Sequence, residues 1–408
     1  MSIVGIIAEY NPFHKGHEYQ IEMTKELTGA EQVVIIMSGN YVQRGEPAIL
    51  NKYTRAKHAL QNGASLVLEL PVCYSTASAE LFAYSAVSML NNLGVIDFIS
   101  FGCETDNIDA FKRIASILVE EPDEYKTLLR TFLSQGEAYP VARKNALCRL
   151  TKDFSISSML ETPNNILAIE YMKALMQTKS TIKPVPIKRT DNGYHSKDTC
   201  GAFASATAIR EQLHSNNLGS LKNLVPENTI SAYAMQRRFV KVEDFSHILA
   251  GKLIYSDNFE NYYDISAFLS NRISNLKDKY TDYSSFIELL LTKNETYTHI
   301  SRALMHILLD ITENDIEYFR ENGTVFYANP LAVDLSDTIL LKKIKNNSSF
   351  ELINKFGDFY KKQSGCTKKM LDINLKADAL YNYVHYMRNG SRPNSDFTIR
   401  NTDKGITG

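Results

Sequence analysis

The chain has 408 residues, with 45 Lys+Arg against 46 Asp+Glu and a hydrophobic content of 44%. This length and near-zero net charge predict a globular protein of two or three domains and exclude wholesale disorder. No apolar run approaches the ~20 residues of a membrane span, and the start lacks the features of a signal peptide. Five scattered cysteines without a Cys-x-x-Cys spacing exclude a zinc ribbon and a disulfide scaffold, and they favour a cytoplasmic location.

Strands and helices are predicted to alternate over residues 1–215. Gln32–Met37 is a continuous apolar run, which is typical of a parallel strand buried on both faces. Strands at this spacing with helices between them indicate a doubly wound α/β sheet. The predicted strands are Ser2–Glu9, Gln32–Met37, Ser65–Leu70, Phe98–Phe101 and an edge strand at Lys183–Ile187, and the predicted helices are His17–Thr28, Tyr53–Asn62 and Ala77–Asn91.

Residues 216–408 are predicted to form a second, mostly α-helical domain. The amphipathic stretches are Ala232–Ile254, Ser284–Leu291, Thr298–Thr312 and Lys376–Arg388, with one possible strand at Gly323–Tyr327 and a frayed end over Asn389–Gly408. Residues 341–408 hold 13 Lys+Arg against 6 Asp+Glu, or +7, which leaves −8 for residues 1–340. This basic region is either a solvated helical face or a surface for a polyanion such as RNA.

The strongest local signal is Asn11–His17 (NPFHKGH), between the first strand and the first helix. Doubly wound folds bind ligands at this edge of the sheet, and the N–H groups of a helix N-terminus favour an anion. Gly16 would let a nucleotide approach the backbone, while His14 and His17 share one face and could contact phosphate oxygens. Two surface histidines that cap a helix, or a metal pair, are the alternatives, although no Cys or acidic ligand set accompanies them.

A second signal is the segment Ser205–Arg210 (SATAIR), which follows a loop containing Gly201. The hydroxyls of Ser205 and Thr207 and the forked guanidinium of Arg210 could receive a phosphate, although Ser205 alone could be a plain helix cap. Together with H-x-G-H, in this order, the segment resembles the nucleotidylyltransferase superfamily, which has a Rossmann-like fold. The KMSKS form of the aminoacyl-tRNA synthetases in that superfamily is absent.

A set of further blocks narrows the resemblance. They are EYNPFHKGH (9–17), MSGNYVQRGEPA (37–48), LELP (68–71), FGCE (101–104), PNNIL (163–167) and YHS (194–196) with SATAIR (205–210). As a set they resemble the bacterial tRNA(Met) cytidine acetate ligase family. Its members activate acetate with ATP, release pyrophosphate, and pass the acetyl group to N4 of the wobble cytidine of elongator tRNA(Met).

The resemblance implies site residues and partners. It implies an ATP-binding catalytic domain over residues 1–215, and residues 216–408 would bind tRNA. His14, His17, Ser205, Thr207 and Arg210 would be catalytic, with Mg²⁺ bridging the phosphates of ATP rather than held by a protein metal site. The implied ATP contacts are Ile7, Ala8, Glu9, Tyr10, Asn11, Pro12, Phe13, His14, Lys15, Gly16, His17, Glu18, Tyr19, Gln20, Gly102, Asn164 and Arg189.

Several of these positions have alternative interpretations. Gly102 could simply be a turn, Asn164 the cap of a helix that starts at Ile166, and Arg189 a partner in a surface ion pair. Gln43, Arg44 and Gly45 could line the acetate or cytidine side of the cleft, whereas Lys52, Arg55 and Lys57 could meet the tRNA backbone or form a solvated helix face. Cys103 is expected to be a small buried residue.

Two other functions stay open from the sequence. One is an adenylyltransferase that joins ATP to a phosphorylated small molecule, although such chains are about half as long. The other is a non-catalytic RNA-binding protein that keeps a nucleotide-binding fold, which the intact His14, His17 and Arg210 argue against.

Overall fold

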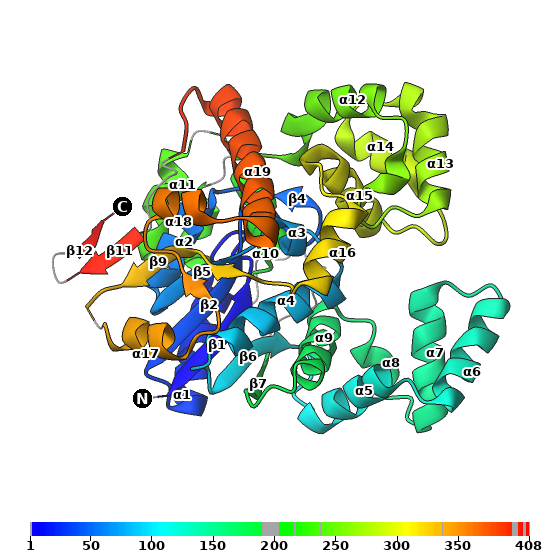
Figure 1. Cartoon of the computed structure of the whole chain (residues 1–408), viewed down its shortest axis with the longest axis horizontal. Helices are drawn as coiled ribbons and strands as arrows, with labels where there is room; N and C mark the ends of the chain where they lie inside the picture. Colours follow the sequence, from blue (N-terminus) through cyan, green and yellow to red (C-terminus); the bar gives the residue numbers. More distant parts are fainter. Residues whose placement is uncertain are drawn as a thin grey trace.

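The computed structural model describes residues 2–189, 204–215, 218–236, 238–336, 338–393, 399–402 and 405–407. Within these residues a sheet of eight strands runs through the molecule in the order β12-β11-β9-β5-β2-β1-β6-β7 (Figure 1). Its parallel centre is confirmed as predicted, with β7 at an edge, where its two prolines are tolerated. The parallel strands are β1 (Ile3–Ala8), β2 (Gln32–Ser38), β5 (Leu66–Leu70), β6 (Phe98–Cys103) and β7 (Lys183–Lys188).

Helices cover both faces of these strands, which explains the continuous apolar run of β2. Helices α1 (Lys15–Thr28) and α2 (Lys52–Gln61) pack on one face, and α4 (Ala79–Asn92) and α9 (Pro163–Gln177) pack on the other. Successive side chains of a strand point to opposite faces. The first face therefore receives Val33, Ile35 and Met37, and the second receives Val34 and Ile36, all of them fully buried.

The C-terminal half extends the same sheet, so the prediction that it has almost no strand is wrong there. Strand β9 (Pro330–Asp334) pairs antiparallel with β5, β11 (Ile399–Thr402) lies parallel to β9, and β12 (Gly405–Thr407) is antiparallel to β11. The expected fraying of Asn389–Gly408 is therefore also wrong for β11 and β12. Neither β9, which begins with proline, nor the polar β11 carries an apolar alternation that would mark a strand. The sheet thus crosses the predicted domain boundary at residue 215.

Most of the helices predicted after residue 215 are present, with two differences. The helix expected over Ala232–Ile254 is two helices, α11 (Glu227–Met235) and α12 (Ser246–Tyr255). The break has a local cause, because the Lys241 N–H donates to Asp244 Oδ2 at 2.7 Å and so starts a new helical segment. The strand expected at Gly323–Tyr327 shares only Tyr327 with β8 (Tyr327–Ala328), which pairs with β10 (Glu351–Leu352).

Two groups of helices stand beside the sheet in Figure 1. The first group follows β6 and precedes α9 along the chain, in a stretch where no helix was predicted. It consists of α5 (Ile108–Glu120), α6 (Asp123–Ser134), α7 (Tyr139–Thr151) and α8 (Ile156–Met159). The other contains α12, α13 (Ala267–Leu276), α14 (Tyr283–Leu290) and α15 (Tyr297–Leu309). The remaining elements are α3 (Val72–Ser75), α10 (Ala206–His214), α16 (Glu313–Glu321), α17 (Ile339–Asn347), α18 (Phe356–Lys362), α19 (Gly365–Asn389), and strands β3 (Tyr41–Val42) and β4 (Glu46–Pro47).

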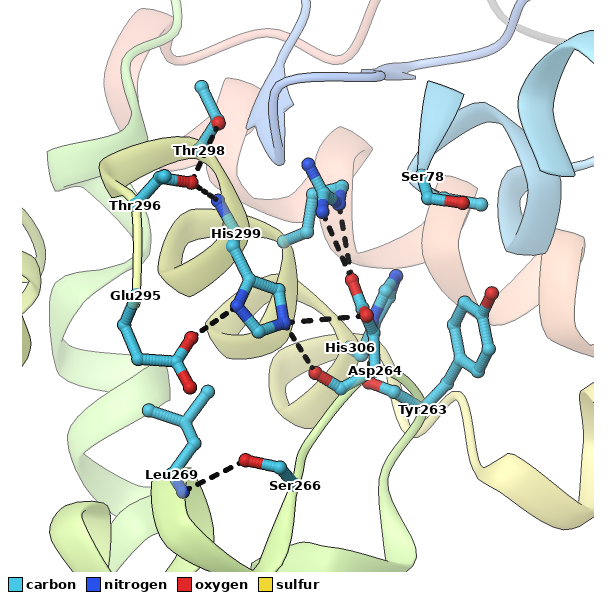
Figure 2. Close-up of polar contacts among 12 residues, drawn as sticks. Ser78, Tyr263, Asp264, Ser266, Leu269, Glu295, Thr296, Thr298, His299 and His306 are labelled. Atoms are coloured by element: carbon cyan, nitrogen blue, oxygen red, sulfur yellow. Dashed lines mark hydrogen bonds and ion pairs between the residues drawn. The ribbon is translucent and has the colours of Figure 1, made fainter. Parts of the chain in front are cut away.

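Helix α15 ties the second helical group to the sheet. The buried His306 lies between the carbonyl oxygens of Tyr263 at 2.9 Å and Thr76 at 3.0 Å, and Ser301 donates to Gly45 O at 3.0 Å. Two turns before His306, His299 is held between the carboxylates of Glu295 and Asp264 (Figure 2). The helical group is therefore joined to the loops after β2 and α3 through buried polar contacts.

Candidate active site

The turn between β1 and α1 is closed by a capping pattern made from two histidines. His14 is the N-cap of α1, and its Nδ1 accepts the Gly16 N–H at 3.1 Å. Nδ1 of His17 in turn accepts the N–H of His14 at 3.3 Å. A neutral imidazole that accepts at one nitrogen carries its proton on the other. Both rings therefore present an Nε2–H donor.

The two imidazoles form a stacked pair, of which His14 is buried and His17 is half-buried. Their ring centroids lie 3.7 Å apart with planes 21° from parallel, and the edges of Tyr10 and Phe13 pack against His17. Burial, with the charges of Arg189 and Arg210, lowers the pKa of His14 to about 3. Burial, then His14 and Arg189, also lowers the pKa of His17 well below its usual value. Both rings are thus neutral donors near pH 7.

The backbone at the start of α1 is less available to an anion than the sequence predicts. The N–H of Lys15 donates to Leu224 O at 3.0 Å, that of Gly16 to His14 Nδ1, and that of His17 to His14 O at 2.8 Å. These first-turn donors already have partners, because the histidine cap and the chain near Leu224 occupy them. The expectation that they face a phosphate is wrong for the structure as it stands, which leaves the two Nε2–H groups as the donors.

The Ser205–Arg210 segment lies against the histidine turn. Nη1 of Arg210 donates to Asn11 O at 2.8 Å, and its Nη2 donates to Thr207 Oγ1 at 3.1 Å. Ser205 is the N-cap of α10, and its Oγ accepts the Ala208 N–H at 3.2 Å. The capping interpretation of Ser205 is correct, and its hydroxyl proton can still be donated to another acceptor. The Gly201 loop and Tyr194–Ser196 lie outside the described residues.

Arg189 and Gly102 lie beside the same turn. The Arg189 N–H continues the ladder of β7 by donating to Cys103 O at 2.8 Å. A Cβ atom built on Gly102 would lie 3.6 Å from Cγ of Arg189, so the arginine side chain crosses bare backbone there. Cys103 is buried as expected, and its burial raises the pKa of the thiol to about 12.

Asn164 is not a helix cap. Helix α9 begins at Pro163 with Thr162 as its N-cap, so Asn164 lies in the first turn, and its Nδ2 donates to Glu104 Oε1 at 2.7 Å. The Asn165 N–H donates to the other Glu104 oxygen at 2.8 Å, and Asn165 Oδ1 accepts the Glu104 N–H at 3.0 Å. Glu104 and Asn165 were not predicted as site residues, although Glu104 lies two residues after Gly102 and Asn165 directly follows Asn164. They fix the loop after β6 to the start of α9.

Part of the implied ATP-binding segment supports the site rather than lining it. Tyr10, Pro12 and Phe13 are buried, and Asn11 Oδ1 accepts the Ile49 N–H at 2.9 Å. Glu9 Oε1 accepts the Gln43 N–H at 2.8 Å, and burial raises the pKa of this carboxyl. These residues hold the loop after β2 against the end of β1.

Two expectations about the segment after β2 are wrong. Lys52 and Arg55 are buried, so neither forms a solvated face or an RNA-backbone contact. Arg55 donates to the carbonyls of Glu9, Ser38 and Gly39, which joins the ends of β1 and β2. Gly45 has φ +75, and a Cβ there would meet the Arg302 backbone at 2.5 Å, so it serves close packing on α15 rather than a ligand.

Within the described part of the chain, no group of three His, Cys, Asp or Glu side chains could hold a metal ion. The described helices include none that is both long and apolar enough to cross a bilayer.

Comparisons with known proteins agree on one group. The family model for the HIGH nucleotidyl transferases matches residues 1–395. A tRNA(Met) cytidine acetate ligase of Clostridium kluyveri is 41% identical over 397 residues, covering 94% of this chain and 95% of the relative, and one of Acetivibrio thermocellus is 38% identical over 392 residues, covering 93% and 94%. The crystal structure of Thermotoga maritima TmcAL with alpha-thio ATP superposes with a TM-score of 0.86 at 29% identity, covering 94% of this chain and 95% of that one. The apo form of that protein gives 0.89 at 28% identity, with the same coverage.

Proposed function

Because the chain belongs to the tRNA(Met) cytidine acetate ligases within the HIGH nucleotidyl transferase family, we propose that it acetylates N4 of the wobble cytidine of elongator tRNA(Met), with ATP and acetate as the other substrates. The observation that carries the proposal is the stacked pair His14–His17 at the end of β1, with Arg210 bonded to the same turn. Two neutral Nε2–H donors and a guanidinium belong to this turn, which suits the triphosphate of ATP.

The first step is the attack of an acetate oxygen on the α-phosphorus of ATP. A new P–O bond forms, the bond to the β-phosphate bridging oxygen breaks, and pyrophosphate leaves. His14 and His17 donate to the oxygens on which negative charge increases, while Ser205, Thr207 and Arg210 hold the β- and γ-phosphates. Arg189, lying over Gly102, adds positive charge next to the histidines.

The second step is acyl transfer from acetyl adenylate. The exocyclic N4 of cytidine attacks the acetyl carbonyl and an N–C bond forms. The C–O bond to the phosphate breaks, AMP leaves, and N4 releases one of its two protons to solvent. Acetyl adenylate is a mixed anhydride and needs no protein nucleophile. Cys103 is buried with a raised thiol pKa, which argues against a covalent role for it. The contribution asked of the protein is to hold two reactants together.

Mg²⁺ fits this scheme as a companion of the nucleotide. Phosphate oxygens and water are its preferred ligands, and the described residues offer no protein cluster that would replace them. When bound, Mg²⁺ would neutralise part of the negative charge of the phosphates. A cytoplasmic location belongs to the same proposal and is supported by the unpaired Cys73, Cys103, Cys148 and Cys366.

The test is incubation of the purified protein with ATP, ¹⁴C-acetate and total tRNA. Label is expected in RNA, in a single acetylated cytidine of the elongator tRNA(Met), together with acetate-dependent ATP–pyrophosphate exchange. A dinucleotide-like product without labelled RNA would instead favour an adenylyltransferase. RNA binding without any exchange would favour a non-catalytic protein.

A further inference from the structure

A cavity opens on the same edge of the sheet as the histidine turn. It has a volume of about 800 Å³ and lies between the start of α2, the ends of β5 and β9, and helices α18 and α19. In the strand order β5-β2-β1, it lies at β5 while the histidines follow β1. Arg55 lies between the cavity and the histidine turn, where it donates to the carbonyl oxygens of Glu9 and Gly39. The next residue after Gly39, Asn40, lines the cavity.

The floor of this cavity is a built polar site. Lys52 is 3% exposed, and its Nζ lies 2.7 Å from Glu69 Oε1 and 2.5 Å from Asp378 Oδ2. Asn40 donates to the second oxygen of Asp378 at 2.8 Å, and Asn329 donates to the second oxygen of Glu69 at 2.7 Å. These residues come from α2, α19, β5 and the loops after β2 and before β9, so the fold assembles the site from distant segments.

The charges on this floor select the ligand. One ammonium and two carboxylates leave a net negative charge, which disfavours acetate or a phosphate at this depth. The side chain of Asp378 is 23% exposed, so its oxygens can accept from a ligand, and burial raises its pKa to about 6. The ammonium of Lys52 has three N–H donors, and the carboxylates of Glu69 and Asp378 accept from two of them, which leaves one for a ligand. A ligand that offers a donor beside an acceptor fits this arrangement.

The walls and the mouth have a different character from the floor. Tyr53 and Phe356 line the cavity and offer aromatic surfaces on which a planar base can stack. Lys355 and Arg400 also line it and supply positive charge for a phosphate. Both cations belong to the basic region 341–408. Aromatic walls, cations and a floor that accepts and donates are the features of a nucleotide pocket in an RNA-binding protein.

We propose that this cavity binds a cytosine base of the RNA substrate, with the base amino group donating to Asp378 and the adjacent ring acceptors facing Lys52. The inference rests on the proposed function, because it takes RNA as the substrate. Carboxylates accept from N4 of cytosine. Uracil presents O4 at that position and would face a carboxylate oxygen, so the pocket discriminates against it.

The first experiment measures base preference directly. Cytidine, uridine and adenosine 5′-monophosphates are titrated into the full-length protein at constant salt, in the presence of saturating ATP so that the nucleotide site is filled. CMP is expected to bind at least 10-fold more tightly than UMP or AMP, and the Asp378→Asn substitution is expected to reduce that preference below 3-fold. Equal binding of CMP and UMP, or tighter binding of AMP, would overturn the proposal.

The second experiment separates the two half-reactions. In Asp378→Asn, kcat/KM for tRNA acetylation is expected to fall at least 30-fold further than the rate of acetate-dependent ATP–pyrophosphate exchange. The matched control is Asp372→Asn on the same helix, whose carboxylate accepts from Tyr360 Oη at 2.5 Å and does not line the cavity. Equal losses in both half-reactions would assign Asp378 a structural role and refute the pocket. Absence of exchange in the unmodified protein would instead refute the proposed function.

Discussion

The guanidinium of Arg210 donates to the carbonyl oxygen of Asn11 at 2.8 Å and so joins two segments that are 199 residues apart. A second N–H of the same group donates to Thr207 Oγ1 at 3.1 Å. Arg210 therefore positions α10 against the histidine turn. The planar guanidinium makes these two bonds from two separate nitrogens in a fixed geometry, which the single nitrogen of a lysine cannot reproduce.

Arg210→Lys is expected to lower acetate-dependent ATP–pyrophosphate exchange by about 100-fold, since removal of one positioned donor at a developing charge typically costs that much. The rate is measured at saturating ATP with labelled pyrophosphate. Arg130→Lys, an exposed position on α6, serves as the control and should change the rate by less than 2-fold. Exchange at the unmodified rate in Arg210→Lys would remove the guanidinium from the reaction.

His14→Asn separates the two tasks of that histidine. Asparagine is a good N-cap and can replace the Nδ1 acceptor, but it cannot place a donor where Nε2–H lies. The free energy of unfolding should therefore stay within about 1 kcal/mol of that of the unmodified protein. The rate of ATP–pyrophosphate exchange should fall by about 100-fold or more. Calorimetry and the exchange assay are run on the same preparation. A large loss of stability with activity retained per folded molecule would mean that His14 serves only as a cap.

The central sheet was predictable because its information is local. A continuous apolar run such as that of β2 is typical of a parallel strand buried on both faces, and the structure places its alternate side chains against α1 and α4. The position of His14 and His17 after β1 follows from the same local pattern. What the sequence could not indicate is that Leu224 O accepts the Lys15 N–H, since that contact depends on how a distant segment packs.

The cavity beside β5 was not predictable, because it too depends on how distant segments pack. Lys52 reads as one of several basic residues on a helix, yet the structure buries it against Asp378, 326 residues away. Its partner Glu69 lies within the predicted strand Ser65–Leu70, where a charge alone indicates little. Strand β9, whose first residue lines the cavity, is short and begins with proline. Its pairing with β5 makes it a strand, and its own sequence does not indicate one.

The stability of the protein is expected to depend on pH through His299. This ring faces Asp264 Oδ1 at 3.3 Å and the Glu295 carboxylate (Figure 2). Arg302 is paired with the other oxygen of Asp264. Burial opposes protonation, but the hydrogen bond and charge of Asp264 with the charge of Glu295 outweigh it and raise the pKa to about 9. The neighbouring His306 has its pKa lowered to about 4 by burial, so it does not titrate in the same range.

A group whose folded-state pKa is raised stabilises the fold fully below its unfolded pKa of about 6.5, and the contribution is lost as pH rises to about 9. Between pH 6.5 and 9.5 the unmodified protein should therefore lose on the order of 2 kcal/mol of unfolding free energy relative to His299→Gln. Urea unfolding of both proteins at five pH values measures the difference. Parallel pH profiles for the two proteins would show that His299 is not protonated in the fold.

The lysines of the basic region 341–408 differ in their surroundings, so their substitutions should differ in their effect on RNA binding. Lys361 and Lys362 are exposed at the end of α18, whereas Lys369 is paired with the buried Asp315 at 2.5 Å. Each phosphate contact adds about 0.9 to the slope of log Kd against log salt for a duplex. The double variant Lys361→Glu with Lys362→Glu should therefore weaken tRNA binding and reduce that slope by about 1 to 2. Lys369→Glu should leave that slope unchanged and instead lower stability, because it places a carboxylate beside Asp315. Filter binding at four salt concentrations tests both, and an unaltered slope in the double variant would exclude α18 from the RNA interface.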